Sequence, residues 1–372
     1  MPPPAAFVPA PFRQGGHPAD GQRPVLDLSQ CANPTGRPAD AVAVLEEFLA
    51  GGSRFDELGV PPDDAAAEFL KAYAADMNFH AAPDAGPTVD SDQLLPGRGV
   101  TEFIELLADA LRASNAKVAV ITPEYTGTIN EFGDFADFSG PTEPRWDTAD
   151  LRLKRVHRAM ETHRYVIFSN PSNPLGHYLK REDLLDICRG HPTSVLIADE
   201  EYIRFQPDAR SLVGADVENL VVWQSVGKSF GIVGCRAGVM WTRNDELRGM
   251  IHVPKWPLSL FDVAVAVAAL KETSWLAKSL RTIKTDAYLL EQQLGVQMGF
   301  SRVSGSVHFR FVHLDDPVPL ANYLRSQGIR VRAFRGDRPG QVAGIRVRTP
   351  IGAAARERLG EAIFTRPADL RV

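Results

Sequence analysis

The sequence of 372 residues predicts an α/β protein in which a large domain, built on a mostly parallel sheet flanked by helices, is joined to a smaller α+β domain. Two observations support this fold class. The chain is longer than a single hydrophobic core usually accommodates, which favours two domains. Short runs rich in apolar and β-branched residues also alternate with helical segments, as buried parallel strands do. These runs are 117–122, 165–170, 194–199 and 219–225.

Helical periodicity and breaker residues place the other elements of the large domain. The N-terminal residues, up to about 25, are rich in Pro and Gly and predict an extended arm. Residues 80–92 are polar, contain two Pro and one Gly, and predict a loop. Helices are expected at 41–49, where Gly51 and Gly52 end the run, and at 65–75, 101–113 and 181–189.

The C-terminal part of the chain predicts the smaller α+β domain. A long helical stretch at 259–295 leads into it, and strands at 308–313 and 345–348 and a closing helix at 353–363 follow. We therefore divide the chain into an N-terminal arm and lid (1–40), a large domain (41–270) and a small domain (271–372).

Composition and charge exclude several classes of partner. The net charge of −5, without a long Lys/Arg run, predicts no binding to nucleic acid. No apolar segment is long enough to cross a bilayer, and the first residues do not resemble a secretion signal. The three cysteines are odd in number and widely spaced, which favours a reducing compartment and a cytoplasmic location. The nine histidines show no metal-ligand spacing, so no metal site is predicted.

Polar side chains follow the predicted parallel strands at their carboxyl ends, where open α/β sheets bind ligands. Tyr125 comes shortly after the first strand and Asn173 after the second. Asp199 ends the third strand, with Tyr202 three residues on, and Lys228 follows the fourth. The topology therefore predicts that two phenols, a carboxamide, a carboxylate and an amine meet at one edge of the sheet.

These residue types match the needs of pyridoxal 5'-phosphate. Its aldehyde requires a lysine amine, and its pyridine nitrogen requires a carboxylate that keeps it protonated. The phenolic oxygen of the cofactor needs hydrogen-bond donors, and its ring needs a stacking partner. Its phosphate needs backbone amides and a cation. The predicted edge supplies these groups, so we expect this cofactor.

Three motifs then resemble the class I and II aminotransferases of fold type I. The segment 225–238, Ser-Val-Gly-Lys-Ser-Phe-Gly-Ile-Val-Gly-Cys-Arg-Ala-Gly, is similar to the cofactor-lysine signature of that family. Residues 169–176, Ser-Asn-Pro-Ser-Asn-Pro-Leu-Gly, resemble its Asn-Pro-x-Asn-Pro-Thr-Gly element, and 199–202 match its Asp-x-x-Tyr. Gly97-Arg98-Gly99 followed by Glu102 resembles most the subgroup of histidinol-phosphate aminotransferases and threonine-phosphate decarboxylases.

The resemblance implies a role for each matching residue. Lys228 would carry the cofactor as a Schiff base and shuttle a proton, and Asp199 would pair with the pyridine nitrogen. Asn173 and Tyr202 would hydrogen-bond the phenolic oxygen, and Tyr125 would stack on the ring. The implied phosphate ligands are Ser225, Arg236 and the start of the helix at Gly99, Val100 and Thr101. The implied substrate-binding residues are Arg346, Arg332 and Asn33, the last in the lid motif 29–36.

The sequence departs from the family pattern in the same region. Gly227 precedes the lysine where a phosphate-binding Ser is frequent, and Cys31 replaces the first Asn of the lid motif. Phe55 stands nearest to the position of a Tyr that reaches the partner subunit's phosphate, and 80–92 is an insertion. These departures indicate an altered pocket and a specialised substrate.

The predicted function is that of a homodimeric aminotransferase which moves an amino group from an amino acid or related amine to a 2-oxo acid. A decarboxylase, cyclase or oxidase of the same fold is the alternative, because the site decides which Cα bond breaks. A nicotinamide-dependent dehydrogenase would need the motif Gly-x-Gly-x-x-Gly directly after a strand, and the sequence lacks it. A Walker-type nucleotide-binding protein would need Gly-x-x-x-x-Gly-Lys-Ser/Thr, which is also missing. A non-catalytic binding protein would be expected to lack Lys228 or Asp199.

Several of the candidate site residues also have a plainer structural interpretation. Asp199 could cap a helix, and Asn173 could serve a turn. Tyr125 and Tyr202 could be core residues, and Arg346 a solvated strand residue.

Overall fold

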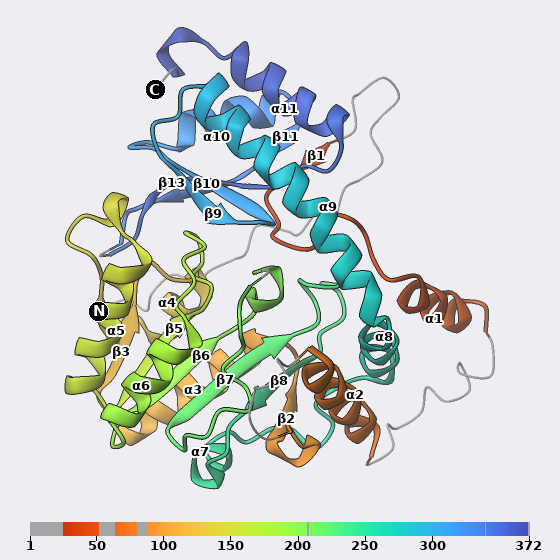
Figure 1. Ribbon diagram of the computed structural model, residues 1–372, viewed down its shortest axis with the longest axis vertical. Coiled ribbons are helices and arrows are strands. Elements are labelled where there is room, and N and C mark those ends of the chain that lie inside the picture. Colours follow the sequence, from red (N-terminus) through yellow and green to blue (C-terminus); the bar gives the residue numbers. More distant parts are fainter. Residues whose placement is uncertain (1–24, 52–63, 81–87, 207, 339, 371–372) are drawn as a thin grey trace, which may run out of the picture.

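A computed structural model describes residues 25–51, 64–80, 88–206, 208–338 and 340–370. Its large domain is built on a seven-stranded sheet in which β3, β4, β5, β6 and β7 run parallel. The remaining strands, β8 and β2, extend it through antiparallel pairs (Figure 1). In sheet order the strands are β2 (Leu94–Gly97), β8 (Gly238–Trp241), β7 (Leu220–Ser225), β6 (Val195–Asp199), β5 (Tyr165–Ser169), β3 (Val118–Ile121) and β4 (Asp137–Ser139). All four parallel strands predicted from the sequence are confirmed.

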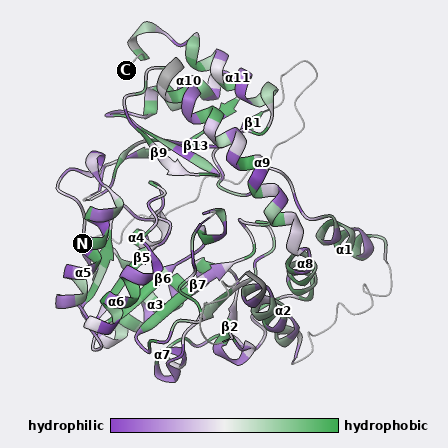
Figure 2. Cartoon of the chain, in the orientation of Figure 1, coloured by the Kyte–Doolittle hydropathy of each residue, from purple (hydrophilic) through white to green (hydrophobic). Residues whose placement is uncertain are grey.

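Helices cover both faces of this sheet, because successive strand residues point to opposite faces. Ile167, Ile197 and Trp223 join the core on one face, and Val166, Leu196 and Val222 join the core on the other. Helices α3 (Val100–Ser114), α4 (Thr126–Phe132) and α7 (Asp245–Gly249) pack on the first face. The second face is covered by α2 (Ala65–His80), α5 (Ala149–Thr162), α6 (Arg181–Gly190) and α8 (Leu260–Lys271). The strands between them are hydrophobic (Figure 2).

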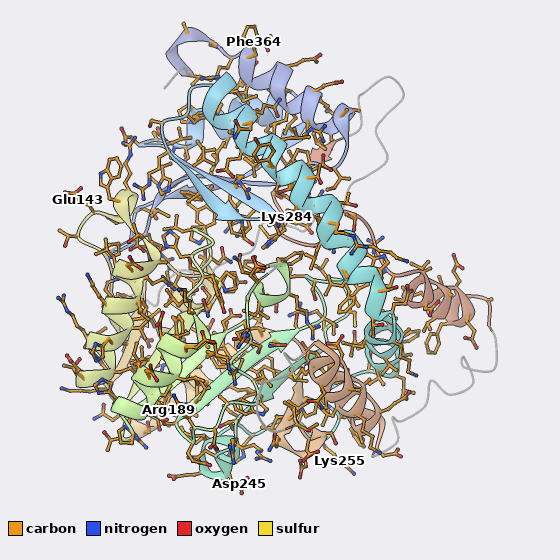
Figure 3. All side chains as sticks on the ribbon, in the orientation of Figure 1. Glu143, Arg189, Asp245, Lys255, Lys284 and Phe364 are labelled. Carbon is orange, nitrogen blue, oxygen red and sulfur yellow. The ribbon has the colours of Figure 1, made fainter. Side chains whose placement is uncertain are left out.

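The small domain contains a four-stranded antiparallel sheet with its own hydrophobic core. Its strands, in order, are β12 (Arg332–Arg335), β13 (Ala343–Arg348), β10 (Phe309–His313) and β9 (Val303–Ser306). Helices α10 (Val318–Ser326) and α11 (Ala353–Phe364) pack in this domain, and Phe364 lies exposed at its outer end (Figure 3). A short strand near the start of the described chain, β1 (Leu26–Asp27), pairs with β11 (Ile329–Arg330).

The helical stretch predicted as one element at 259–295 is two helices. The backbone at Glu272 leaves the helical conformation, with ψ 61°, and separates α8 from α9 (Thr273–Gln292). A turn of π-helix, Gln293–Gln297, continues α9. Figure 1 shows α9 running from the large domain up to the small one. The Glu272 carboxylate accepts a hydrogen bond from the main chain of Asp40, at the start of α1 (Ala39–Leu49).

The other predicted helices are present with shifted ends, and α2 extends five residues beyond the predicted 65–75. Most of the predicted arm, 1–24, Phe55 and residues 81–87 of the predicted loop lie outside the described residues. Within the described ranges, no helix is long and apolar enough to cross a membrane, and no group of His, Cys, Asp and Glu residues could hold a metal ion.

Candidate active site

The carboxyl ends of the parallel strands meet at one edge of the large sheet. Ser169 at the end of β5 lies beside Asp199 at the end of β6, and Asp199 lies beside Trp223 in β7. The segments that leave these strands therefore begin side by side. This register brings the loops that carry the predicted site residues to one place.

The Asp199 carboxyl is buried at this edge without a cationic partner. Its Oδ1 accepts a hydrogen bond from the Glu201 main-chain N–H at 2.8 Å. No ion pair with Asp199 is formed in the described part of the chain. Burial, together with the nearby carboxylates of Glu201, Glu124 and Glu200, holds the pKa of Asp199 well above its usual range. A cation placed against this carboxyl would stabilise its ionised form and so lower its pKa.

Asn173, Tyr202 and Arg346 form one hydrogen-bonded group that joins the two domains. The Arg346 guanidinium on β13 donates to Asn173 Oδ1 at 2.6 Å, and Asn173 Nδ2 donates to the Tyr202 hydroxyl at 3.4 Å. The guanidinium lies between the rings of Phe309 and Phe334, 5.6 and 5.4 Å from their centres. All three polar residues are buried. Arg346 is thus held in place and is not a solvated strand residue.

Tyr125 is positioned by a buried ion pair beneath it. Glu124 and Arg152 are both fully buried and form a salt bridge of 3.0 Å. The Glu124 carboxylate also accepts from the Tyr125 main-chain N–H at 2.6 Å, and Arg152 donates to the Pro123 carbonyl at 2.9 Å. A Cβ at Gly127 would overlap with the Tyr125 ring, so only glycine leaves room for the ring there. Burial and the charges of Asp199 and Glu201 raise the pKa of the Tyr125 hydroxyl.

A cradle of main-chain amides and one guanidinium lies at the start of α3. Gly99 precedes the helix with φ +78°, a backbone conformation that favours glycine, and the first helical amides, Val100 and Thr101, follow it. The Arg236 guanidinium lies against Gly99 and donates to the Arg98 carbonyl at 3.0 Å. A Cβ on Gly99 would be 2.9 Å from Arg236 Nη2. Free amides at a helix N-terminus beside a guanidinium suit a phosphate.

Lys228 lies half-buried in the loop after β7. Its carbonyl accepts hydrogen bonds from the main-chain N–H of Asn33 at 2.8 Å and of Gly231 at 3.3 Å. Burial raises the pKa of the Glu201 carboxyl, and the Lys228 ammonium opposes this rise; burial lowers the pKa of His308, and the charges of Arg346 and Lys228 lower it further. The lysine is thus close to the Glu201 carboxylate.

Two of the predicted substrate-binding residues occupy different environments. The Asn33 carboxamide donates to Ser229 O at 2.9 Å and to Ser279 Oγ at 2.7 Å and accepts from Thr35. It therefore ties the N-terminal segment to the loop of Lys228. Arg332 is exposed on β12, directly opposite Arg346 in the strand register, with its guanidinium 5.8 Å from the Phe334 ring. A substrate role for either residue stays a prediction.

Two further side chains of the site did not appear among the sequence predictions. The carboxylate of the half-buried Glu201 accepts a hydrogen bond from the Ser225 hydroxyl at 2.8 Å. The His308 imidazole is fully buried, stacks on Phe205 with ring centres 3.8 Å apart and meets the Tyr202 ring edge-on. Burial and the charges of Arg346 and Lys228 hold the pKa of His308 well below its usual range, so the imidazole is neutral. The acidic run Asp199-Glu200-Glu201 was the available signal for Glu201, whereas His308 had none.

These residues fit pyridoxal 5'-phosphate. The carboxyl of Asp199, which has no cationic partner among the described residues, matches a protonated pyridine nitrogen. The amides at the start of α3 and Arg236 match the phosphate, and Lys228 matches the aldehyde. One feature fits less well, because the Glu201 carboxylate engages the Ser225 hydroxyl that would otherwise serve the phosphate.

Comparison with known proteins gives the family. The sequence profile of the class I and II aminotransferases matches residues 23–353. The histidinol-phosphate aminotransferase of Clostridium kluyveri is 25% identical over 283 residues, which cover 71% of this chain and 78% of that protein.

Solved structures agree in fold. The histidinol-phosphate aminotransferase from Clostridium acetobutylicum superposes with a TM-score of 0.76 at 21% identity and covers 91% of this chain and 98% of its own. The enzyme from Sinorhizobium meliloti, in complex with pyridoxal 5'-phosphate, has a TM-score of 0.74 at 18% identity and covers 93% and 92%. The chain belongs to the class I and II aminotransferases and is a pyridoxal-phosphate-dependent enzyme of that family.

Proposed function

We propose that this aminotransferase uses Lys228 and Asp199 as its central pair and takes an amino donor that carries an anionic group. The observation that carries the proposal is the joint placement of a buried carboxyl without a cationic partner, a nearby lysine, and a buried arginine from the small domain. The histidinol-phosphate aminotransferases among its relatives act, by name, on a phosphorylated donor. A phosphate or carboxylate on the donor is consistent with Arg346.

Each side chain has a defined task in this proposal. Pyridoxal phosphate, when bound, supplies the electron sink that stabilises negative charge at the substrate Cα. Asp199 holds the proton on the pyridine nitrogen. Lys228 takes the proton from the substrate Cα and returns it on the cofactor side. Tyr125 supplies the stacking surface.

The remaining groups fix the orientation of cofactor and substrate. Asn173 and Tyr202 hold the phenolic oxygen, and Arg236, Ser225 and the amides of Val100 and Thr101 hold the phosphate. Arg346 binds the anionic group of the donor, so that the Cα–H bond stands perpendicular to the ring. Its hydrogen bond to Asn173 links substrate binding to cofactor binding through one buried network.

The assembly and the location are proposals as well. A homodimer is supported by large apolar side chains on α1 and α8, since Leu49 is 87% exposed and Leu45 and Phe261 are about 40% exposed. A cytoplasmic location is supported by three free cysteines, two of them buried. We also keep the division into an arm and lid (1–40), a large domain (41–270) and a small domain (271–372). Light scattering at the mass of one chain, with full activity, would count against the dimer.

The reaction type is tested by one half-reaction without an acceptor. The holoenzyme is mixed with single amino donors, with and without an anionic group, and the products are quantified. Transamination gives pyridoxamine phosphate and the carbonyl product of the donor (a 2-oxo acid where the donor has an α-carboxylate) in equal amounts, and only anionic donors react well. Release of carbon dioxide, consumption of oxygen or a cyclised product, with the aldehyde form of the cofactor recovered, would instead assign a decarboxylase, an oxidase or a cyclase.

A further inference from the structure

Glu201 is a half-buried residue, with its Oε2 atom buried, that the proposed mechanism does not use. It lies two residues after Asp199, at the edge where the cofactor binds. One of its oxygens accepts a hydrogen bond from Ser225 Oγ at 2.8 Å, and the Ser225 oxygen in turn accepts from the Gly227 main-chain N–H at 3.2 Å. The other oxygen, Oε2, is buried and meets no hydrogen-bond partner of good geometry among the described residues, while the Lys228 main-chain N–H lies near the carboxylate and acts to lower its pKa. A buried acceptor without a partner is costly unless a ligand completes it.

The groups around Glu201 come from several elements. Lys228 and Arg236, in the segment after β7, are cations near Glu201, and Asp199 at the end of β6 is an anion near it. The phenols of Tyr73 on α2, Tyr125 before α4 and Tyr202 also lie within electrostatic range. Burial raises the pKa of the Glu201 carboxyl, while Lys228, the Ser225 hydroxyl and Arg236 act in the opposite direction.

The Glu201 carboxylate lies where it would oppose the binding of a phosphate. Ser225 and Arg236 are two of the proposed phosphate ligands, and Glu201 is bonded to the first and close to the second. A phosphate monoester carries a charge of about −1.5 to −2 at pH 7. Beside an ionised carboxylate it would be repelled. Beside a protonated carboxyl it would gain a hydrogen bond from the oxygen that now lacks a partner.

We propose that Glu201 is a proton-linked switch of the phosphate subsite: the cofactor phosphate binds together with one proton, which Glu201 Oε2 holds and donates to a phosphate oxygen. This inference rests on the proposed assignment of Ser225 and Arg236 to the phosphate. In consequence, cofactor affinity falls as the pH rises above the range in which Glu201 can take up that proton. The departure at Gly227 is consistent with it, because the residue before Lys228 has no hydroxyl that could serve the phosphate.

The test measures cofactor binding to the full-length protein after removal of its cofactor. The dissociation constant of pyridoxal 5'-phosphate is determined between pH 6 and 9 for the wild type, Glu201→Gln and the control Glu218→Gln, whose carboxylate is 67% exposed. We expect the wild-type Kd to rise relative to Glu201→Gln by up to about tenfold per pH unit. The Kd of the control Glu218→Gln should show the same pH dependence as the wild-type Kd. Calorimetry in two buffers of different ionisation enthalpy should show one proton fewer taken up by Glu201→Gln.

A second probe separates phosphate effects from effects on Lys228. Pyridoxal has the aldehyde but no phosphate, so its Kd should show the same pH dependence in wild type and variant. If Glu201→Gln does not fold, the wild type alone still decides, because it should take up one proton more with the phosphorylated probe than with pyridoxal. A Kd ratio that is constant with pH, or equal proton uptake with both probes, would overturn the switch. Absence of cofactor binding in both proteins at every pH would overturn the underlying phosphate assignment as well.

Discussion

Asp199→Asn replaces the carboxylate at the end of β6 by a neutral group of nearly the same shape. The Asp199 carboxyl has no ion-pair partner among the described residues, so its charge is available to the pyridine nitrogen of the cofactor. A close opposite charge shifts a pKa by about one to three units, and each unit corresponds to about 1.4 kcal/mol. The variant should therefore lose about 1.4 to 4 kcal/mol of stabilisation in the proton-transfer step. This loss corresponds to a rate about 10- to 1000-fold lower.

The assay is a single turnover of the donor half-reaction, followed by stopped-flow absorbance at saturating cofactor. Asp186→Asn, on the exposed surface of α6, is the control and should keep the wild-type rate. Saturation must be shown separately for each protein, since the prediction concerns the rate and not the amount of bound cofactor. A wild-type rate in Asp199→Asn would refute the proposed charge pairing.

The same substitution has an opposite effect on the protein without cofactor. Burial raises the pKa of Asp199 in the folded state, so below the unfolded pKa of about 3.9 the carboxyl is neutral in both states. As the pH rises above that value, the unfolded state ionises more readily and folding stability is lost. Asp199→Asn removes this loss and should raise the melting temperature of the cofactor-free protein at pH 8 more than at pH 4. A variant that is less stable than wild type at pH 8 would contradict the argument.

Three further substitutions test other parts of the site. Arg152→Met leaves the buried Glu124 carboxylate without its partner and should lower the free energy of unfolding by about 3 to 5 kcal/mol in urea titrations; an unchanged midpoint would show that the pair contributes nothing. Gly127→Ala should displace the Tyr125 ring and raise the Kd for cofactor, whereas Gly190→Ala, where a Cβ would meet nothing within 4 Å, should not; equal effects would remove the steric argument. Arg346→Gln should lower kcat/KM for anionic donors about 10- to 150-fold, as loss of about 1.5 to 3 kcal/mol for a charged hydrogen bond implies. The exposed Arg330→Gln is its control, and a similar loss in both would argue against a specific role of Arg346.

The buried strands were predictable because they are short, apolar and rich in β-branched residues. The outer strands β2 and β4 could not be predicted, each for its own physical reason. β2 contains Pro96 and Gly97, which suit an edge strand but weaken any strand signal. β4 has only three residues. The break between α8 and α9 at Glu272 has no Gly or Pro to mark it, so sequence periodicity alone reads the two helices as one.

The site divides in a similar way. The residues at strand ends, such as Asp199 and Asn173, could be brought together by the topology rule for parallel sheets. Contacts between segments that are distant in the sequence could not be predicted in this way. The Asn33 carboxamide is engaged by Ser279, 246 residues away, and sequence reasoning had no access to that contact. Glu201 falls on an unspecified position of the Asp-x-x-Tyr motif, where only the three-dimensional structure reveals its bond to Ser225.

Lys228 is the residue that we propose to bind the cofactor covalently. Borohydride reduction of the holoenzyme, followed by peptide mapping, tests this proposal directly. We expect the cofactor to be fixed to Lys228, and Lys228→Ala to carry no label and no activity while its fold is preserved. A label on any other lysine, or turnover by Lys228→Ala, would contradict the assignment of the site.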